Sequence, residues 1–148
     1  MKILIVHAHP EPKSFCSAMK DTAVETFQNL GHEVQVSDLH QMNWNPVASG
    51  DDFEVRSQPD YLVYALEQRE SCYGGKRFYD QGGLKGKKGL LAFTLGGREH
   101  MFGQDKIHGE METMLRPLLR GSLAYVGLSV LPPFIGWHVP YITDEARQ

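Results

Sequence analysis

The residues from His7 to Phe15 (HAHPEPKSF) have the composition of a turn that could bind an anion. An apolar run precedes this segment, and Ser14 is suited to cap a helix that follows it. Free N–H groups and the helix dipole attract phosphate at such a position. The turn contains neither GxGxxG nor GxxxxGK[ST], so Rossmann-type dinucleotide binding and P-loop chemistry are not indicated. The alternative is an ordinary strand–helix connection, and spacing alone leaves both interpretations open.

A second candidate turn is Thr94–Gly97 (TLGG), which follows another apolar run. Paired glycines let a flat ligand approach the backbone closely, although a plain turn has the same composition. His108 could exchange a proton near neutral pH, but a solvated or capping histidine is the commoner case. Three aromatic residues could stack on a ligand or belong to the core: Tyr73, Phe78 and Tyr79.

Metal binding is not expected. His7 and His9 are two residues apart and would share one face of a strand, but no carboxylate or cysteine follows at a metal-ligand spacing. Cys16 and Cys72 form no CxxC motif, which favours reduced thiols in a cytoplasmic protein over a disulfide or zinc site.

The first half of the chain has the pattern of a βαβ unit. Lys2–Val6 (KILIV) predicts a strand buried on both faces. An apolar stripe of helical period then runs from Ser14 as cap to Gly31 as C-terminal stop. Glu33–Val36 (EVQV) predicts a second strand, which the right-handed crossover rule makes parallel to the first.

The second half predicts three more elements. Lys88–Thr94 has the composition of a strand, and Met111–Ala124 that of a helix that Pro117 should kink or split. Leu128–Leu131 predicts a last short strand, stopped by the two prolines that follow it. The alternation of strands and helices indicates a doubly wound α/β fold with a parallel sheet.

The region between residues 38 and 87 contains no buried-strand pattern. Its one apolar run, Tyr61–Leu66, follows Ser57 and Pro59 and is expected to begin a helix. A compact domain rarely contains so long a stretch with so little regular structure. We therefore expect the sequence to lack an element of the fold.

Length and charge limit the classes of protein to which this chain could belong. A chain of 148 residues suits a single domain, residues 1–148. Its 15 Lys and Arg against 18 Asp and Glu form no basic stripe, which disfavours nucleic acid and anionic membranes as partners. No apolar run approaches the roughly 18 residues that span a bilayer, and the N-terminal run is too short for a signal peptide. A cytoplasmic protein is expected.

Several segments together resemble the NAD(P)H:quinone oxidoreductases of the DT-diaphorase type: IVHAHPEPKSF, SDLHQMNWNPVAS, FYDQGGLKGKKGLLAFTLGG, MLRPLLRGSLAYVG and VLPPFIGWHVPYITDEA. The resemblance implies a flavodoxin-like fold with strand order 2-1-3-4-5. It also implies a homodimer that binds FAD, or FMN as in some bacterial relatives. Hydride would pass from NAD(P)H to the flavin and then to a quinone, in a ping-pong two-electron reduction.

The resemblance also implies roles for individual residues. The loop beside the flavin diphosphate and adenosine would contain His9, Ser14, Phe15, Cys16 and Ala18. The turn along the isoalloxazine ring would contain Thr94, Leu95, Gly96 and Gly97. His108 would be the catalytic residue that stabilises charge on the reduced flavin, and Tyr73 would contact the substrate. Phe102 would also bind the cofactor, although it stands where the family has a tyrosine. Cys16 and Leu95 replace family Asn and Thr residues.

The largest departure from the family lies between Cys72 and Tyr73, where the resemblance implies about 50 further residues, enough for a crossover and a strand. These residues would supply the third strand and the loop beneath the flavin ring. The chain also ends at Gln148, before the final helix of the family. The expected function is therefore flavin-dependent quinone reduction; the alternatives are an inactive or weakly flavin-binding member that dimerises as a structural protein, and a flavodoxin-like electron carrier.

Overall fold

A computed structural model describes residues 1–47, 77–143 and 145–147. Contacts divide the chain into two units, residues 1–48 with 139–148 and residues 49–138, and each unit is described by itself. No helix within the described residues is long and apolar enough to cross a membrane.

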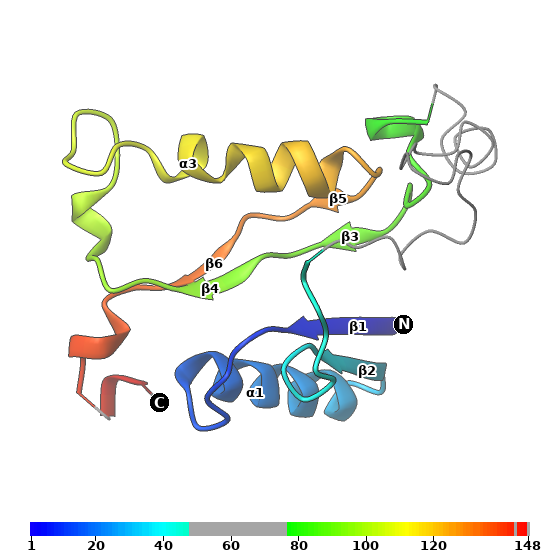
Figure 1. The fold of residues 1–148 in the computed structure, drawn as a ribbon, viewed down its shortest axis with the longest axis horizontal. Coiled ribbons are helices and arrows are strands. Elements are labelled where there is room, and N and C mark those ends of the chain that lie inside the picture. Colours follow the sequence, from blue (N-terminus) through cyan, green and yellow to red (C-terminus); the bar gives the residue numbers. More distant parts are fainter. Residues whose placement is uncertain (48–76, 144, 148) are drawn as a thin grey trace. The chain divides into compact units, whose positions relative to one another are not determined.

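The first unit is built on a βαβ arrangement (Figure 1). Strand β1 (Lys2–His7) pairs with β2 (Glu33–Asp38) in parallel, with Ile3 opposite Val34. Helix α1 (Phe15–Asn29) connects the two strands. The predicted parallel pairing is confirmed. The unit also contains two short 3₁₀ helices, η6 (Val139–Tyr141) and η7 (Glu145–Arg147).

Both ends of α1 follow the sequence signals. The hydroxyl oxygen of Ser14 caps the N-terminus by accepting the N–H of Ser17 at 3.1 Å. At the other end Gly31 adopts a φ of 77°, and its N–H donates to the Gln28 carbonyl. His32 N–H donates to the Phe27 carbonyl, which completes a Schellman motif. The predicted stop at Gly31 is confirmed.

The expectation that β1 is buried on both faces is wrong. Leu4 and Val6 are 62% and 60% exposed, whereas Ile3 and Ile5 are half-buried. Successive side chains of a strand point to opposite faces, and among the described residues of this unit α1 contacts β1 and β2. An unbroken apolar run does not by itself reveal whether both faces are covered.

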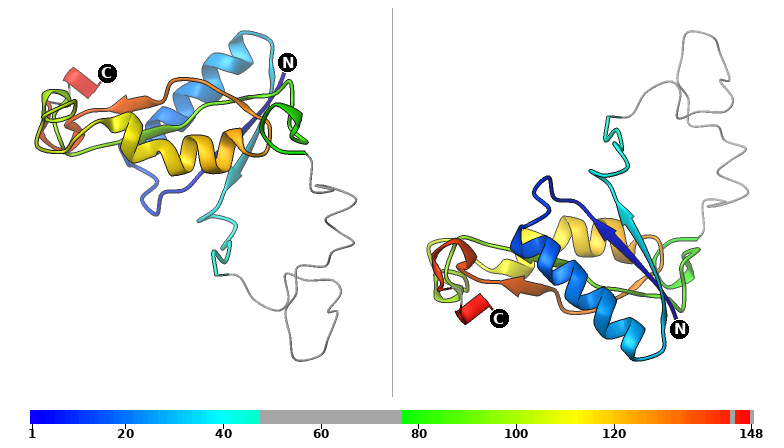
Figure 2. Two further views of the ribbon diagram at one scale, coloured as in Figure 1. Left: turned by 90° about the horizontal axis from the view of Figure 1, so that it is seen from above. Right: turned by 90° about the horizontal axis from the view of Figure 1, so that it is seen from below.

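The second unit contains two short parallel ladders that follow one another along the same two segments, residues 88–94 and 129–136 (Figure 2). Strand β3 (Lys88–Gly89) pairs with β5 (Ser129–Val130), and β4 (Ala92–Thr94) pairs with β6 (Phe134–Gly136). The single strand predicted over residues 88–94 is therefore divided in two, and β6 was not predicted.

A bulge explains both differences. Leu90 and Leu91 lie opposite three residues, Leu131–Pro133, so the second strand carries one extra residue. The two prolines have no N–H to donate, but pairing resumes where Phe134 N–H donates to the Leu91 carbonyl at 2.8 Å. The prolines interrupt the strand that was expected to end there.

The predicted helix begins as α3 (Met111–Leu118) and continues as a π-helix, η5 (Leu119–Ala124). Pro117 lies in α3 and cannot donate a backbone hydrogen bond, so the regular ladder is broken near this point. The break expected at Pro117 is thus a change from α-helix to π-helix, and α3 ends at Leu118, one residue after the proline. Two 3₁₀ helices complete the unit, η3 (Tyr79–Gln81) and η4 (Glu99–Met101).

The η3 segment is held against the end of η5 by backbone hydrogen bonds. Tyr79 N–H donates to the Tyr125 carbonyl at 2.9 Å, and Leu84 N–H donates to the Val126 carbonyl at 3.0 Å. Between these bonds the backbones of Gly82 and Gly127 approach each other so closely that a Cβ atom at Gly82 would lie 2.4 Å from Val126.

In the regions 38–47 and 77–87 the only strand residue is the end of β2; the residues between them lie outside the described part of the chain.

Candidate functional site

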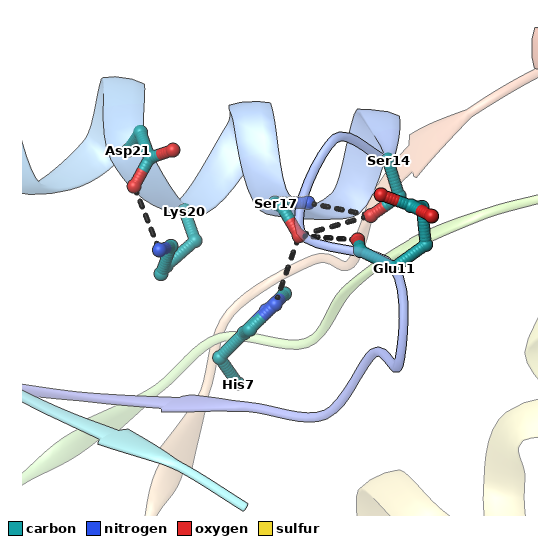
Figure 3. A network of polar contacts seen from close by, with 6 residues as sticks. All are labelled: His7, Glu11, Ser14, Ser17, Lys20 and Asp21. Carbon is teal, nitrogen blue, oxygen red and sulfur yellow. Dashed lines mark hydrogen bonds and ion pairs between the residues drawn. The ribbon is translucent and has the colours of Figure 1, made fainter. Parts of the chain in front are cut away.

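The predicted anion-binding turn contains a network of hydroxyl groups (Figure 3). Ser17, on α1, is 2% exposed, and its hydroxyl donates to the Glu11 carbonyl at 3.0 Å. Its oxygen also lies 3.2 Å from Nε2 of His7 and 3.0 Å from the Ser14 hydroxyl. Because the one hydroxyl proton of Ser17 goes to a carbonyl, His7 and Ser14 must act as donors to Ser17. The network fixes the loop between β1 and α1.

This direction of donation excludes a role for Ser17 as a nucleophile. A nucleophilic serine requires a histidine that accepts its proton, whereas His7 donates to Ser17. Both side chains are also buried. Within the described residues no three His, Cys, Asp or Glu side chains are grouped so that they could hold a metal ion. The network therefore has a structural role.

The structure brings the predicted diphosphate-loop residues together around this network. Nδ1 of His9 accepts the N–H of Glu11 at 3.0 Å. Phe15 and Cys16 begin α1, and Phe15 N–H donates to none of the described residues. Ala18 is exposed one turn into the helix. The helix therefore presents an unused N–H group at its positive end, which suits an anion.

The predicted ring-side residues gather separately, within the second unit. Thr94 is the last residue of β4, and Leu95–Gly97 follow it at the carboxyl end of the strand. A Cβ atom placed on Gly97 would lie 3.0 Å from the Phe102 ring, so this ring packs directly on the glycine backbone. The His108 ring lies 4.8 Å from the Phe102 ring, centroid to centroid. The structure thus brings Phe102 and His108 to the turn; Tyr73 lies outside the described residues.

A closed loop between η4 and α3 carries His108. Gly103 N–H donates to the Gly109 carbonyl at 2.8 Å, and His108 N–H donates to the Met101 carbonyl at 3.2 Å. The helix predicted from Met111 begins at that residue, so His108 lies in the loop before it. The imidazole is exposed, so it can exchange protons with solvent or a ligand.

Sequence reasoning missed three residues of this cluster. The Trp137 ring lies 5.1 Å from the Phe102 ring. Arg98 and His138 form hydrogen bonds beside the glycine turn. The signal in the sequence was the Trp-His pair, which directly follows β6. Because β6 pairs with β4, this pair lies at the end of β4, but it could be recognised only once β6 was known.

Other candidate ligand residues have partners within the fold. Phe78 stacks on Tyr125 at 4.8 Å, and Tyr79 meets the same ring edge-on at 5.7 Å. A groove of about 920 Å³ lies between α3 and the β5–β6 segment, with Leu115, Leu119 and Ile135 among its lining residues. None of the predicted ligand residues lines this groove.

The buried hydroxyl predicts a loss of stability on substitution. Ser17→Ala removes the partner of both the Glu11 carbonyl and His7, and should lower the free energy of unfolding by about 1–3 kcal/mol. The measurement is urea denaturation followed by circular dichroism. Thr22→Ala, at an exposed position of the same helix, is the control and should change it by less than about 0.5 kcal/mol. Equal effects of the two substitutions would contradict the assigned network.

Asp38 predicts a pH dependence of stability. The N–H of Gln41 lowers the pKa of Asp38 below its usual value of 3.8, aided by His7 and opposed by desolvation. A lowered pKa stabilises the fold above the unfolded-state value, and this contribution is lost as the pH falls through the folded-state value. The urea midpoint should therefore fall below about pH 4. Asp38→Asn, which keeps an acceptor oxygen, should reduce this fall; an unchanged pH profile would disprove the assignment.

Comparison with known proteins agrees with the α/β fold described above. The family described as having a flavodoxin-like fold matches residues 1–73 and again residues 70–148. A mouse ribosyldihydronicotinamide dehydrogenase [quinone] is 31% identical over 198 aligned positions, which cover 99% of this chain and 86% of the relative. A guinea pig NAD(P)H dehydrogenase [quinone] 1 is 28% identical, with 99% and 72% covered.

Solved structures show the same fold. A candidate quinone reductase of Klebsiella pneumoniae has a TM-score of 0.88 and 23% identity, with 99% of this chain and 79% of that chain covered. An NAD(P)H:quinone oxidoreductase of Methanothermobacter marburgensis has a TM-score of 0.65 and 18% identity, with 99% and 89% covered. These likenesses support the parallel α/β architecture.

The comparisons also agree with the departure that the sequence suggested. Aligning 99% of a 148-residue chain over 198 positions leaves about 50 positions of the mouse relative without a counterpart. The two family matches meet at residues 70–73, next to the expected gap between Cys72 and Tyr73. The chain belongs to the flavodoxin-like family that includes the quinone oxidoreductases.

Proposed function

We propose that this chain is a flavin-dependent NAD(P)H:quinone oxidoreductase. The observation that carries the proposal is the cluster of Gly97, Phe102 and His108 at the carboxyl end of β4. Ligands of parallel α/β folds bind at that end of the strands. The related dehydrogenases named above supply the reaction type.

The residues of the turn fit one edge of a flavin ring. Gly96 is exposed and has no side chain, so a flat ring could approach the backbone there, beside the Phe102 ring that packs on Gly97. The N–H groups of Gly97 and Arg98 have no acceptor among the described residues, and carbonyl oxygens of a flavin would provide one. Thr94 and Leu95 would border the same ring.

The loop before α1 suits the phosphate groups. Phe15 N–H and the start of α1 would face them, with Cys16, Ala18 and His9 nearby. The Ser14 hydroxyl is already bonded within the loop, so its side chain would have to release Ser17 to bind phosphate. FAD is the proposed cofactor, and FMN is the alternative.

A bound flavin would supply the two-electron chemistry, taking a hydride from NAD(P)H and giving it to a quinone. His108 would hold positive charge or a proton beside the reduced ring, because its imidazole is exposed and borders Phe102. Phe102 has no hydroxyl and would contribute only apolar contact. Tyr73 is the proposed substrate contact, and a cytoplasmic homodimer is the proposed form of the enzyme.

A specific observation favours a second candidate function. About 50 aligned positions of the mouse relative have no counterpart here, and Leu4 and Val6 are largely exposed. Both facts are expected for a member that binds flavin weakly and acts as a dimerising structural protein.

The test is the absorption spectrum, flavin stoichiometry and NAD(P)H–quinone turnover of the purified chain, with and without added FAD or FMN. His108→Gln should lower turnover at saturating flavin by at least about tenfold. His100→Gln, an exposed histidine of η4, is the matched control and should leave turnover unchanged. Absence of flavin binding at any concentration would favour the structural role.

A further inference from the structure

His138 makes three hydrogen-bond contacts around the glycine turn. Its backbone N–H donates to the Gly97 carbonyl at 3.0 Å. Its ring nitrogen Nδ1 lies 2.9 Å from the Gly96 carbonyl. Nε of Arg98 donates to the other ring nitrogen, Nε2, at 3.3 Å. The side chain therefore joins the end of β6 to the turn that follows β4.

These two ring contacts are matched by one tautomer of the imidazole. A carbonyl can only accept, so Nδ1 must carry the proton that it shares with Gly96. The Arg98 guanidinium can only donate, so Nε2 must be unprotonated. The Nδ1–H tautomer of His138 fits both contacts, because it donates to Gly96 and accepts from Arg98.

The backbone of His138 is unusual as well. Its φ is 55°, in the left-handed region that non-glycine residues seldom occupy. Such a conformation is retained when surrounding contacts hold it, and it is often found at functional sites. Here the left-handed backbone allows the N–H and the ring of one residue to reach two consecutive carbonyls.

Holding the two carbonyls also orients two donors. No peptide bond among the described residues is cis, so each N–H points opposite to the carbonyl of its own peptide unit. The Gly96 and Gly97 carbonyls both point to His138. The N–H groups of Gly97 and Arg98 therefore both point away from His138, toward the side where they have no described acceptor.

We propose that His138, supported by Arg98, is a positioning residue that orients the Gly97 and Arg98 N–H groups toward the flavin ring. This inference rests on the proposed function, because it assigns a ligand to those donors. The ring of His138 need not touch the flavin. Arg98 acts through His138 by fixing its tautomer.

A purely structural role is the alternative. The backbone bond from His138 to Gly97 closes the β4–β6 ladder whichever side chain is present. The imidazole would then matter for stability but not for ligand affinity. Variants that keep the backbone but change the side chain separate these two roles.

The test compares His138→Asn with His138→Gly in the full chain. Asparagine tolerates a positive φ and its side-chain N–H can replace the bond to Gly96. Glycine also tolerates this φ but offers no side-chain donor. Dissociation constants for FAD and FMN are measured by fluorescence quenching, and the free energy of unfolding by urea denaturation.

We expect His138→Gly to weaken flavin binding by about two- to tenfold, the range that one neutral hydrogen bond carries. His138→Asn should stay within about twofold of the wild type. Equal affinity for all three proteins, or loss of stability without loss of affinity, would overturn the positioning role.

A second measurement keeps the outcome clear if the wild-type chain binds no flavin. Nitrogen-15 spectra should show His138 as the Nδ1–H tautomer, and His138→Gly should shift the amide signals of Gly97 and Arg98. If these shifts are seen but no flavin binds, His138 does orient the Gly97 and Arg98 amides. Its proposed role in flavin binding is then rejected together with the proposed function. An Nε2–H tautomer or unshifted amides would reject the orientation itself.

Discussion

Insertion of the corresponding segment of a relative between Cys72 and Tyr73 is expected to raise flavin affinity by about ten- to a hundredfold, because it should restore a stacking surface worth about 1–3 kcal/mol. About 50 aligned positions of the mouse relative have no counterpart in this chain, and the two family matches meet at residues 70–73. The family resemblance assigns to the missing positions a central strand and the loop beneath the flavin ring. The chain without this segment should bind flavin weakly and reduce quinones slowly. Flavin stoichiometry and NAD(P)H–quinone turnover measure the effect.

Two controls make this prediction specific. A glycine- and serine-rich insert of equal length should restore neither affinity nor turnover, because it supplies no surface to stack on the ring. Phe102→Tyr alone should not restore flavin retention either, since it adds one hydroxyl at a ring that already packs on Gly97. Tight FAD binding and rapid turnover by the unmodified chain would show that the missing positions are dispensable.

Gly82→Ala is expected to lower the free energy of unfolding by about 3 kcal/mol or more. Its Cβ would lie 2.4 Å from the carbonyl carbon and oxygen of Val126 and 2.5 Å from the Gly127 nitrogen. All three are backbone atoms, which cannot move aside as a side chain would. The η3 segment would have to separate from the end of η5 and give up the bonds at Tyr79 and Leu84. Denaturant unfolding measures the loss.

The neighbouring glycine provides the matched control. A Cβ atom at Gly83 would meet no atom within 4 Å, and Gly83 does not have a positive φ. Gly83→Ala should therefore be neutral, or stabilising by up to about 1 kcal/mol through the unfolded chain. A similar loss of stability for both variants would show that the close approach at Gly82 does not hold the segment.

Local signals explain why the βαβ unit could be predicted from the sequence. The Ser14 cap, the Gly31 stop and two short strands separated by one helix each act within a few residues. The bulge in β5–β6 could not be predicted, because Pro132 and Pro133 usually end a strand. Only the register with β4 shows that pairing resumes at Phe134.

The candidate site likewise contains residues that could be predicted from the sequence and residues that could not. The resemblance indicated Thr94–Gly97, Phe102 and His108, and in the structure the Phe102 ring lies against Gly97 and beside His108. Their roles toward a flavin remain predictions. His138 could not be recognised, because its contact with Gly96 joins residues 42 positions apart and depends on the pairing of β4 with β6.

The two prolines of the bulge also bear on self-association. Pairing of β-strands between molecules needs a row of N–H donors along an edge, and Pro132 and Pro133 interrupt that row on β5–β6. Among the described residues β1 pairs with β2 alone, contains no proline and exposes Leu4 and Val6, so it has the character of an edge on which aggregation begins. A charged residue in place of Leu4 should therefore improve the yield of the chain more than any change at the bulge.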